Sequence, residues 1–142
     1  MCCFDIAKWS EQSKAGKEPI QESMTETEMK QRTKAFALRV IKLSNSVSNS
    51  LVGRRLGDQL LRAGTSVAAN YRAACRARSK PEFISKLGIA EEEADESVLW
   101  IELLIESGIV PQKKLAKLLD EANQLTAIIV ASRKKAGGHK DF

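Results

Sequence analysis

The feature that most constrains the fold is a repeat of apolar residues at steps of three and four, which recurs in four segments. In the first segment, Phe36, Val40, Leu43 and Val47 follow this spacing. Because an α-helix turns once in 3.6 residues, such residues form a stripe along one side of a helix. The other stripes are Leu56, Leu60, Ala63, Gly64, Val67, Tyr71, Ala74 and Cys75, then Phe83, Leu87, Ala90, Ala94, Ile101 and Leu104, then Leu115, Leu118, Leu119, Ala122, Leu125 and Ile129. The pattern predicts an all-α protein with four amphipathic helices.

Helix-start and helix-stop signals separate these segments. Thr25 and Glu28 have the spacing of a capping box, and Ser79 and Glu82 repeat it in the run SKPE. The second helix is expected from about residue 53 to residue 77, so the link to the third is very short. The other boundaries are the polar run SNSVSNS after the first helix, Ser107-Gly108 after the third, Pro111 before the fourth and Gly137-Gly138 after it.

Short links between long helices favour an antiparallel up-down four-helix bundle, which is expected to span residues 24–136. Residues 1–23 show no sustained period and include Gly16 and Pro19, so they are predicted to form a flexible N-terminal extension. Residues 137–142 are predicted to form a flexible C-terminal tail. Met24 is a candidate for the natural start, and the sequence leaves open whether residues 1–23 belong to the native protein.

The composition bounds the function classes. A formal charge of +5 is compatible with an acidic partner and equally with an ordinary solvated bundle. The three cysteines form no CxxC pair or disulfide framework, which favours a reducing compartment. No apolar run approaches the roughly 20 residues of a membrane span, and the first ten residues lack the features of a signal peptide. A cytoplasmic protein that does not bind a membrane is therefore expected.

The second helix divides into two faces. Its apolar stripe is expected in the core, while Arg55, Asp58, Arg62, Arg72 and Arg76 lie on the opposite arc. Charged residues usually occupy the solvated side of a bundle helix, which is the simplest explanation. Small residues between the arginines instead favour close approach by another backbone, and they make this arc a candidate subunit interface. These small residues are Thr65, Ser66, Ala69 and Ala73.

Charge is segregated between the second and third helices. Residues 53–80 hold seven basic residues and one acidic residue, whereas residues 82–106 hold eight acidic residues and one lysine. Exposed ion pairs contribute only about 0–1 kcal/mol, so contact between the basic face of one subunit and the acidic face of another is the better explanation. Such a heterologous contact favours a closed ring over a twofold dimer. The interface candidates on the third helix are Leu99, Leu103, Glu92 and Glu96.

Residues for catalysis or metal binding are scarce. The single histidine, His139, lies in the predicted tail, which leaves no Glu-x-x-His site and no Ser-His or Cys-His pair. Consecutive carboxylates between Glu91 and Glu96 diverge by about 100° per residue on a helix, so they do not all reach one ion. No phosphate-binding glycine loop or dinucleotide fingerprint occurs. We expect no metal, no cofactor and no enzymatic activity.

The sequence also resembles a known family. The pattern Gln-Leu-x-Arg-Ala-x-x-Ser-Val-x-x-Asn is met by Gln59, Leu60, Arg62, Ala63, Ser66, Val67 and Asn70. With the following run KLGIAEEEADESVLWIELLIESG, it is similar to the four-helix-bundle proteins encoded within ribosomal RNA intervening sequences. The similarity spans roughly residues 34–134. Many members follow the Asn with Ile or Leu, Ala, Glu and Gly, whereas this chain has Tyr71, Arg72, Ala73 and Ala74, a more basic face.

This resemblance implies an up-down bundle that assembles into a ring-like pentamer. One branch of the family, the accessory variability determinant of diversity-generating retroelements, is a basic pentamer that binds nucleic acid and a reverse transcriptase. The resemblance therefore suggests RNA or DNA, and a reverse transcriptase, as partners. Many members have no known activity.

Two functions remain open from the sequence. The first is a non-enzymatic homo-oligomeric scaffold, pentameric by resemblance, whose basic surface binds RNA or DNA. The second is a protein-interaction module in which the same arginines contact subunits or a partner protein; an enzyme is a distant third. Phosphate contacts with little base stacking are expected in the first. Its candidate residues are Arg54, Arg55, Arg62, Arg72, Arg76, Arg78, Lys80, Arg133, Lys134 and Lys135.

Overall fold

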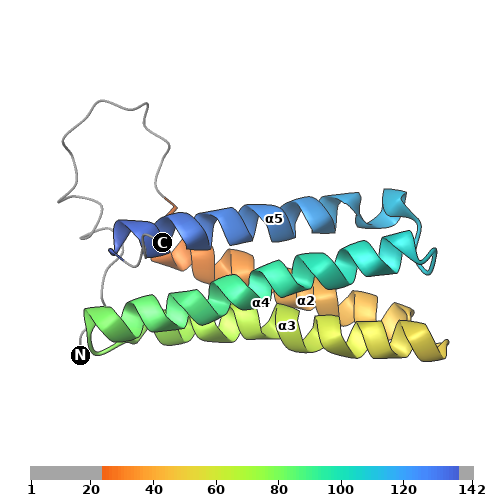
Figure 1. Ribbon diagram of the computed structural model, residues 1–142, viewed down its shortest axis with the longest axis horizontal. Helices are drawn as coiled ribbons and strands as arrows, with labels where there is room; N and C mark the ends of the chain where they lie inside the picture. The colour runs from red at the N-terminus through yellow and green to blue at the C-terminus, as the bar shows by residue number, and fades with distance from the viewer. Residues whose placement is uncertain (1–23, 138–142) are drawn as a thin grey trace, which may run out of the picture.

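A computed structural model describes residues 24–137 of the protein. These residues form four antiparallel α-helices. The helices are α2 (Glu26–Ser46), α3 (Leu51–Cys75), α4 (Lys80–Glu106) and α5 (Gln112–Lys135). Each packs against the next in the chain, and α2 lies beside α5 in a looser contact. This is the predicted all-α up-down bundle (Figure 1). The flexible extension predicted at residues 1–23 and, apart from Gly137, the flexible tail predicted at residues 137–142 lie outside the described residues.

The helix ends follow the predicted signals, except that α3 both begins and ends two residues before the predicted positions, at Leu51 and Cys75. Thr25 and Glu28 form the expected capping box, in which the Glu28 carboxylate accepts from the Thr25 N–H at 2.8 Å. Helix α3 begins two residues earlier than expected, because the Ser50 hydroxyl accepts from the Gly53 N–H at 3.0 Å and caps it. The last serine of the polar run is thus a helix start rather than part of a loop.

Helix α4, the third helix in the chain, is capped differently from the capping box that the run SKPE suggests. The Ser79 hydroxyl accepts from the Glu82 N–H at 3.2 Å, as expected, but the Glu82 carboxylate accepts from the Arg78 N–H at 2.8 Å instead of the Ser79 N–H. The carboxylate therefore orders the turn one residue before the cap. At the other end, Gly108 has φ of 78°, the left-handed conformation that glycine accepts without strain.

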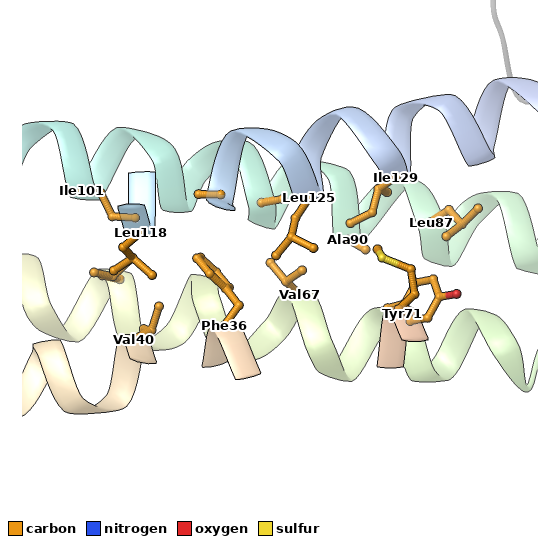
Figure 2. Close-up of a cluster of buried hydrophobic side chains, with 14 of the residues drawn as sticks. Phe36, Val40, Val67, Tyr71, Leu87, Ala90, Ile101, Leu118, Leu125 and Ile129 are labelled. Atoms are coloured by element: carbon orange, nitrogen blue, oxygen red, sulfur yellow. The ribbon is translucent and has the colours of Figure 1, made fainter. Parts of the chain in front are cut away.

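The core lies along the inner faces of all four helices. Phe36 and Val40 of α2, Val67 of α3 and Leu125 of α5 point into the space between the helices (Figure 2). Two polar residues are also fully buried. Thr33 and Ser97 donate their hydroxyls to carbonyl oxygens of their own helices, at 2.9 and 2.7 Å, so their burial leaves no unpaired donor.

Glycines bring α2 and α3 close together. The β-carbon of an alanine at Gly64 would lie 2.9 Å from both γ-methyl groups of Val40, and one at Gly57 would lie 3.1 Å from a γ-methyl of Val47. The Ser44 hydroxyl donates to the Gly57 carbonyl at 2.9 Å across the same contact. Side chains larger than hydrogen would therefore push the two helices apart.

Within residues 24–137, no helix combines the length and the apolar character needed to cross a membrane.

Candidate nucleic-acid interface

The candidate nucleic-acid residues lie mostly at one end of the bundle. The C-terminus of α3, the turn into α4 and the C-terminus of α5 meet there, because the helices alternate in direction. The α3–α4 turn adjoins the end of α5, since a β-carbon at Gly137 would lie 3.6 Å from the Lys80 Nζ. We call this surface the basic end; its members are Arg72, Arg76, Arg78, Lys80, Lys134 and Lys135, all exposed.

Two other candidates lie at the opposite end. Arg54 and Arg55 are exposed in the first turns of α3, and Arg54 is 22 residues before Arg76, the C-cap of that helix. At a rise of 1.5 Å per residue, this separation is about 33 Å along the axis. The sequence places all these arginines on one helix, but one short nucleic-acid segment would not contact both ends.

The two remaining candidates are engaged within the chain. Arg62 pairs with Glu96 and with Glu93, the latter at 3.3 Å between Nη1 and Oε2. Arg133 pairs with Glu91, at 2.5 Å between Nε and Oε2 and 3.2 Å between Nη2 and Oε1. Both pairs tie helices to α4, so these two guanidinium groups are already neutralised by carboxylates.

A further ion pair, which the sequence analysis did not identify, joins α2 to α5. The Arg32 Nε donates to the Glu121 Oε1 at 2.6 Å, and its Nη2 donates to the Gln124 Oε1 at 2.6 Å. The partners are 89 and 92 residues apart, so only the closure of the bundle brings them together. This contact crosses the side where the helices pack most loosely.

The predicted interface residues of α4 have mixed surroundings. Leu99 and Leu103 are exposed as expected, at 46% and 37%. Glu92 is exposed, whereas Glu96 already contacts Arg62 and accepts from the Trp100 indole N–H at 3.3 Å. Ile89 is also exposed on this helix and was not among the predicted contacts. The outer side of α4 therefore carries more apolar surface than the sequence analysis assigned to it.

The predicted interface residues of α3 form a shallow outer surface. Ala69 is exposed, and the other three, Thr65, Ser66 and Ala73, are partly buried. The Thr65 hydroxyl donates to the Leu61 carbonyl at 2.7 Å, so it has no free donor for a partner.

Tyr71 and Cys75 form a buried polar group in the core near the basic end. Burial raises the pKa of the Cys75 thiol to about 12 and also raises the pKa of Tyr71. The Glu26 carboxylate adds to both increases and the Cys75 thiol adds to that of Tyr71, whereas the Tyr71 hydroxyl lowers the pKa of Cys75. The Tyr71 hydroxyl is buried without a hydrogen-bond partner of normal geometry among the described residues, and the polar group beside it is the Cys75 thiol, a weak hydrogen-bonding group. A neutral, inaccessible thiol is a packing residue and not a nucleophile.

These features define the class of the protein as a small helical bundle whose distinctive groups lie on its outer faces and ends. A model of the 23S rRNA-intervening sequence protein family matches residues 25–131, and the chain belongs to that family. No curated protein is significantly similar to the chain. The crystal structure of a protein of unknown function from the S23 ribosomal protein family of Bacteroides thetaiotaomicron is similar, with 30% identity and a TM-score of 0.72. The match covers 77% of this chain and 97% of that one, which confirms the resemblance and the bundle.

Proposed function

We propose that the protein is a non-enzymatic, homo-oligomeric helical scaffold, pentameric as its resemblance implies, whose basic end binds RNA or DNA. The observation that carries this proposal is the gathering of basic side chains from α3, the α3–α4 turn and α5 at one end of the bundle. Among the described residues, the side chains of Arg72, Arg76, Arg78, Lys134 and Lys135 form no ion pair with an acidic residue. They are therefore available to phosphates.

Binding through these residues would depend on charge and not on base sequence. Arginine and lysine contact phosphate oxygens, and these contacts position a protein without reading bases. In a ring whose axis runs along the bundles, the basic ends of all subunits would lie on one face and would act together on one polyanion. The family name refers to 23S rRNA, which makes a structured RNA the first ligand to test.

The test is fluorescence anisotropy of a labelled structured RNA, titrated with the full chain from about 50 to 200 mM salt. Contact with 6–10 phosphates predicts a loss of about 10³–10⁵ in affinity over that range. The double variant Arg76→Ala/Arg78→Ala should weaken binding and make the logarithmic salt slope shallower by about two. The matched control is Arg54→Ala/Arg55→Ala, which removes the same charge from the opposite end.

Equal weakening by both double variants would contradict the assignment to the basic end. Absence of salt-dependent binding would contradict nucleic-acid binding itself and would favour the protein-interaction alternative. That alternative makes a separate prediction, because reversing Arg72 with Arg72→Glu would then dissociate the oligomer instead of abolishing RNA binding.

A further inference from the structure

The exposed large aliphatic side chains are not scattered over the bundle. Among the described residues they lie on α2, on the first turn of α3 and on α4, and none lies on α5. On α4 they accompany the exposed Glu92 and the half-buried Glu96 at steps of three and four. We call this surface the acidic face of α4; its members are Ile89, Glu92, Glu96, Leu99 and Leu103. An apolar stripe within a charged helix face is typical of a protein contact.

Helix α2 carries a surface of complementary composition, which the sequence analysis did not identify. Leu38 is 58% exposed and Ile41 is 39% exposed, and Lys34 and Lys42 are exposed beside them. From residue 30 to its end at residue 46, α2 contains five basic residues and no acidic residue. We call these four residues the basic face of α2. It offers aliphatic groups to the leucines of α4 and ammonium groups to its carboxylates.

The two faces point away from each other. Helices α2 and α4 occupy diagonal positions, because each packs against both α3 and α5. Figure 1 shows α4 passing in front of α2, with α3 and α5 on either side. The two faces of one chain are therefore out of each other's reach. They are placed so that one chain can contact two different neighbours, one through each face.

The faces also lie at the same level along the bundle. Figure 2 shows Val40 of α2 beside Ile101 of α4 and far from Ala90, which lies three turns earlier on α4. Val40 and Ile101 are therefore at nearly the same height. Because α2 and α4 run in the same direction, Leu38 is level with Leu99, and Lys34 lies within one turn of the level of Glu92.

We propose that the acidic face of α4 in one subunit packs against the basic face of α2 in a second copy of the chain. This inference rests on the homo-oligomer of the proposed function and names its interface. Rotation about an axis parallel to the bundle keeps residues at their own level, so it would bring Leu38 to Leu99 and Lys34 to Glu92. The contact is heterologous, and repeating it closes a ring. It leaves the basic end of α3 outside the subunit contact.

The outer side of α3 is a poorer partner for α4. Around Thr65 and Ala69 it presents small side chains and no large aliphatic group, so Ile89 and Leu99 would find little apolar surface to bury there. Charge alone suits both helices, but the basic face of α2 matches the acidic face of α4 in charge and in apolar character together. This reassigns the basic partner of α4 from the arginine side of α3 to α2.

A charge-swap experiment tests the pairing by size-exclusion chromatography with light scattering. Lys34→Glu and Glu92→Lys should each weaken association at least about tenfold, because each places like charges opposite one another. Combining both substitutions in one chain should restore the wild-type assembly, since every interface then regains an opposite pair. Ala69→Glu on α3 is the control and should leave the assembly unchanged. All three positions are exposed, and circular dichroism of each variant checks that the bundle is folded.

The outcomes separate this inference from the function on which it rests. If Lys34→Glu and Glu92→Lys stay assembled, or if the double variant does not recover, the α2–α4 pairing is wrong while the oligomer stands. If Ala69→Glu alone dissociates the assembly, the interface lies on α3. If the wild-type chain is a monomer, the oligomer and the pairing both fail. RNA affinity of the wild-type chain is measured in parallel and reports on the basic end.

Discussion

The close contact between α2 and α3 predicts that alanine has opposite effects at two helical glycines. At Gly64, a β-carbon would lie 2.9 Å from both γ-methyl groups of Val40, which is inside van der Waals contact. At Gly88 in α4, the nearest atom to a β-carbon is the Arg133 Cδ at 3.9 Å, an ordinary contact. Both positions are inside helices, so both replacements gain the same intrinsic helix propensity.

The expected magnitudes follow from these two terms. Replacing glycine by alanine in a helix interior contributes about 0.8–1 kcal/mol of stability. Gly88→Ala should show nearly all of it. Gly64→Ala adds a strain of about 1–3 kcal/mol from overpacking. Val40 is fully buried and restricted at χ1, so its side chain does not rotate away from the new methyl group. Gly64→Ala should therefore lie about 1–3 kcal/mol below Gly88→Ala in free energy of unfolding.

Removing the methyl groups of Val40 should turn the effect of Gly64→Ala on the free energy of unfolding from destabilising to stabilising. Val40→Ala by itself should cost about 2 kcal/mol, since it leaves room in a packed core. In the double variant Gly64→Ala/Val40→Ala, the new methyl group occupies part of that room, and the two substitutions should couple favourably by about 1–3 kcal/mol. The coupling isolates the contact between α2 and α3 from the helix propensity.

Urea unfolding followed by circular dichroism at 222 nm measures all four variants. The chain concentration must be held constant, because assembly makes the midpoint concentration-dependent. A difference of 1 kcal/mol corresponds to about 4 °C in thermal midpoint for a domain of this size. If Gly64→Ala stabilises the protein as much as Gly88→Ala, or if the double variant shows no coupling, α2 and α3 do not approach as closely as described.

Four further outcomes are expected. Stability should fall as the pH rises from about 9 to 12, by up to about 1.4 kcal/mol per unit for one group, because unfolded Cys75 loses its proton in this range while the folded thiol keeps it. Tyr71→Phe should cost little at pH 7, since the lost hydroxyl is unpaired, and urea midpoints from pH 7 to 11 should show a shallower alkaline decline in this variant. Ser79→Ala should lower the unfolding free energy by about 1 kcal/mol through loss of the α4 cap, and an unchanged urea midpoint would contradict that role. Arg62→Ala should leave RNA affinity unchanged in the anisotropy titration, because two carboxylates already hold that guanidinium; a loss as large as that of Arg76→Ala would contradict this.

The sequence by itself determined the secondary structure and the topology. The apolar spacing at Phe36, Val40 and Leu43 fixes a helix face because it repeats with the period of the helix. Local signals fixed the ends, as at Thr25 and Gly108, because a cap involves only residues within one turn. Short links then left each helix with no alternative to packing antiparallel against the next. The first and last residues of the helices were predictable to within about two residues, because the capping signals are local.

Tertiary structure alone decided which charged groups remain available. Arg62 and Arg76 are equivalent in the sequence, yet the register of α3 against α4 pairs only the first with Glu93 and Glu96. That register depends on packing across the whole hairpin, which no local pattern encodes. The same holds for Leu38, whose exposure follows from where α3 and α5 cover α2. A helix period shows that a residue lies off the main stripe, but only the arrangement of neighbouring helices shows whether another element covers it.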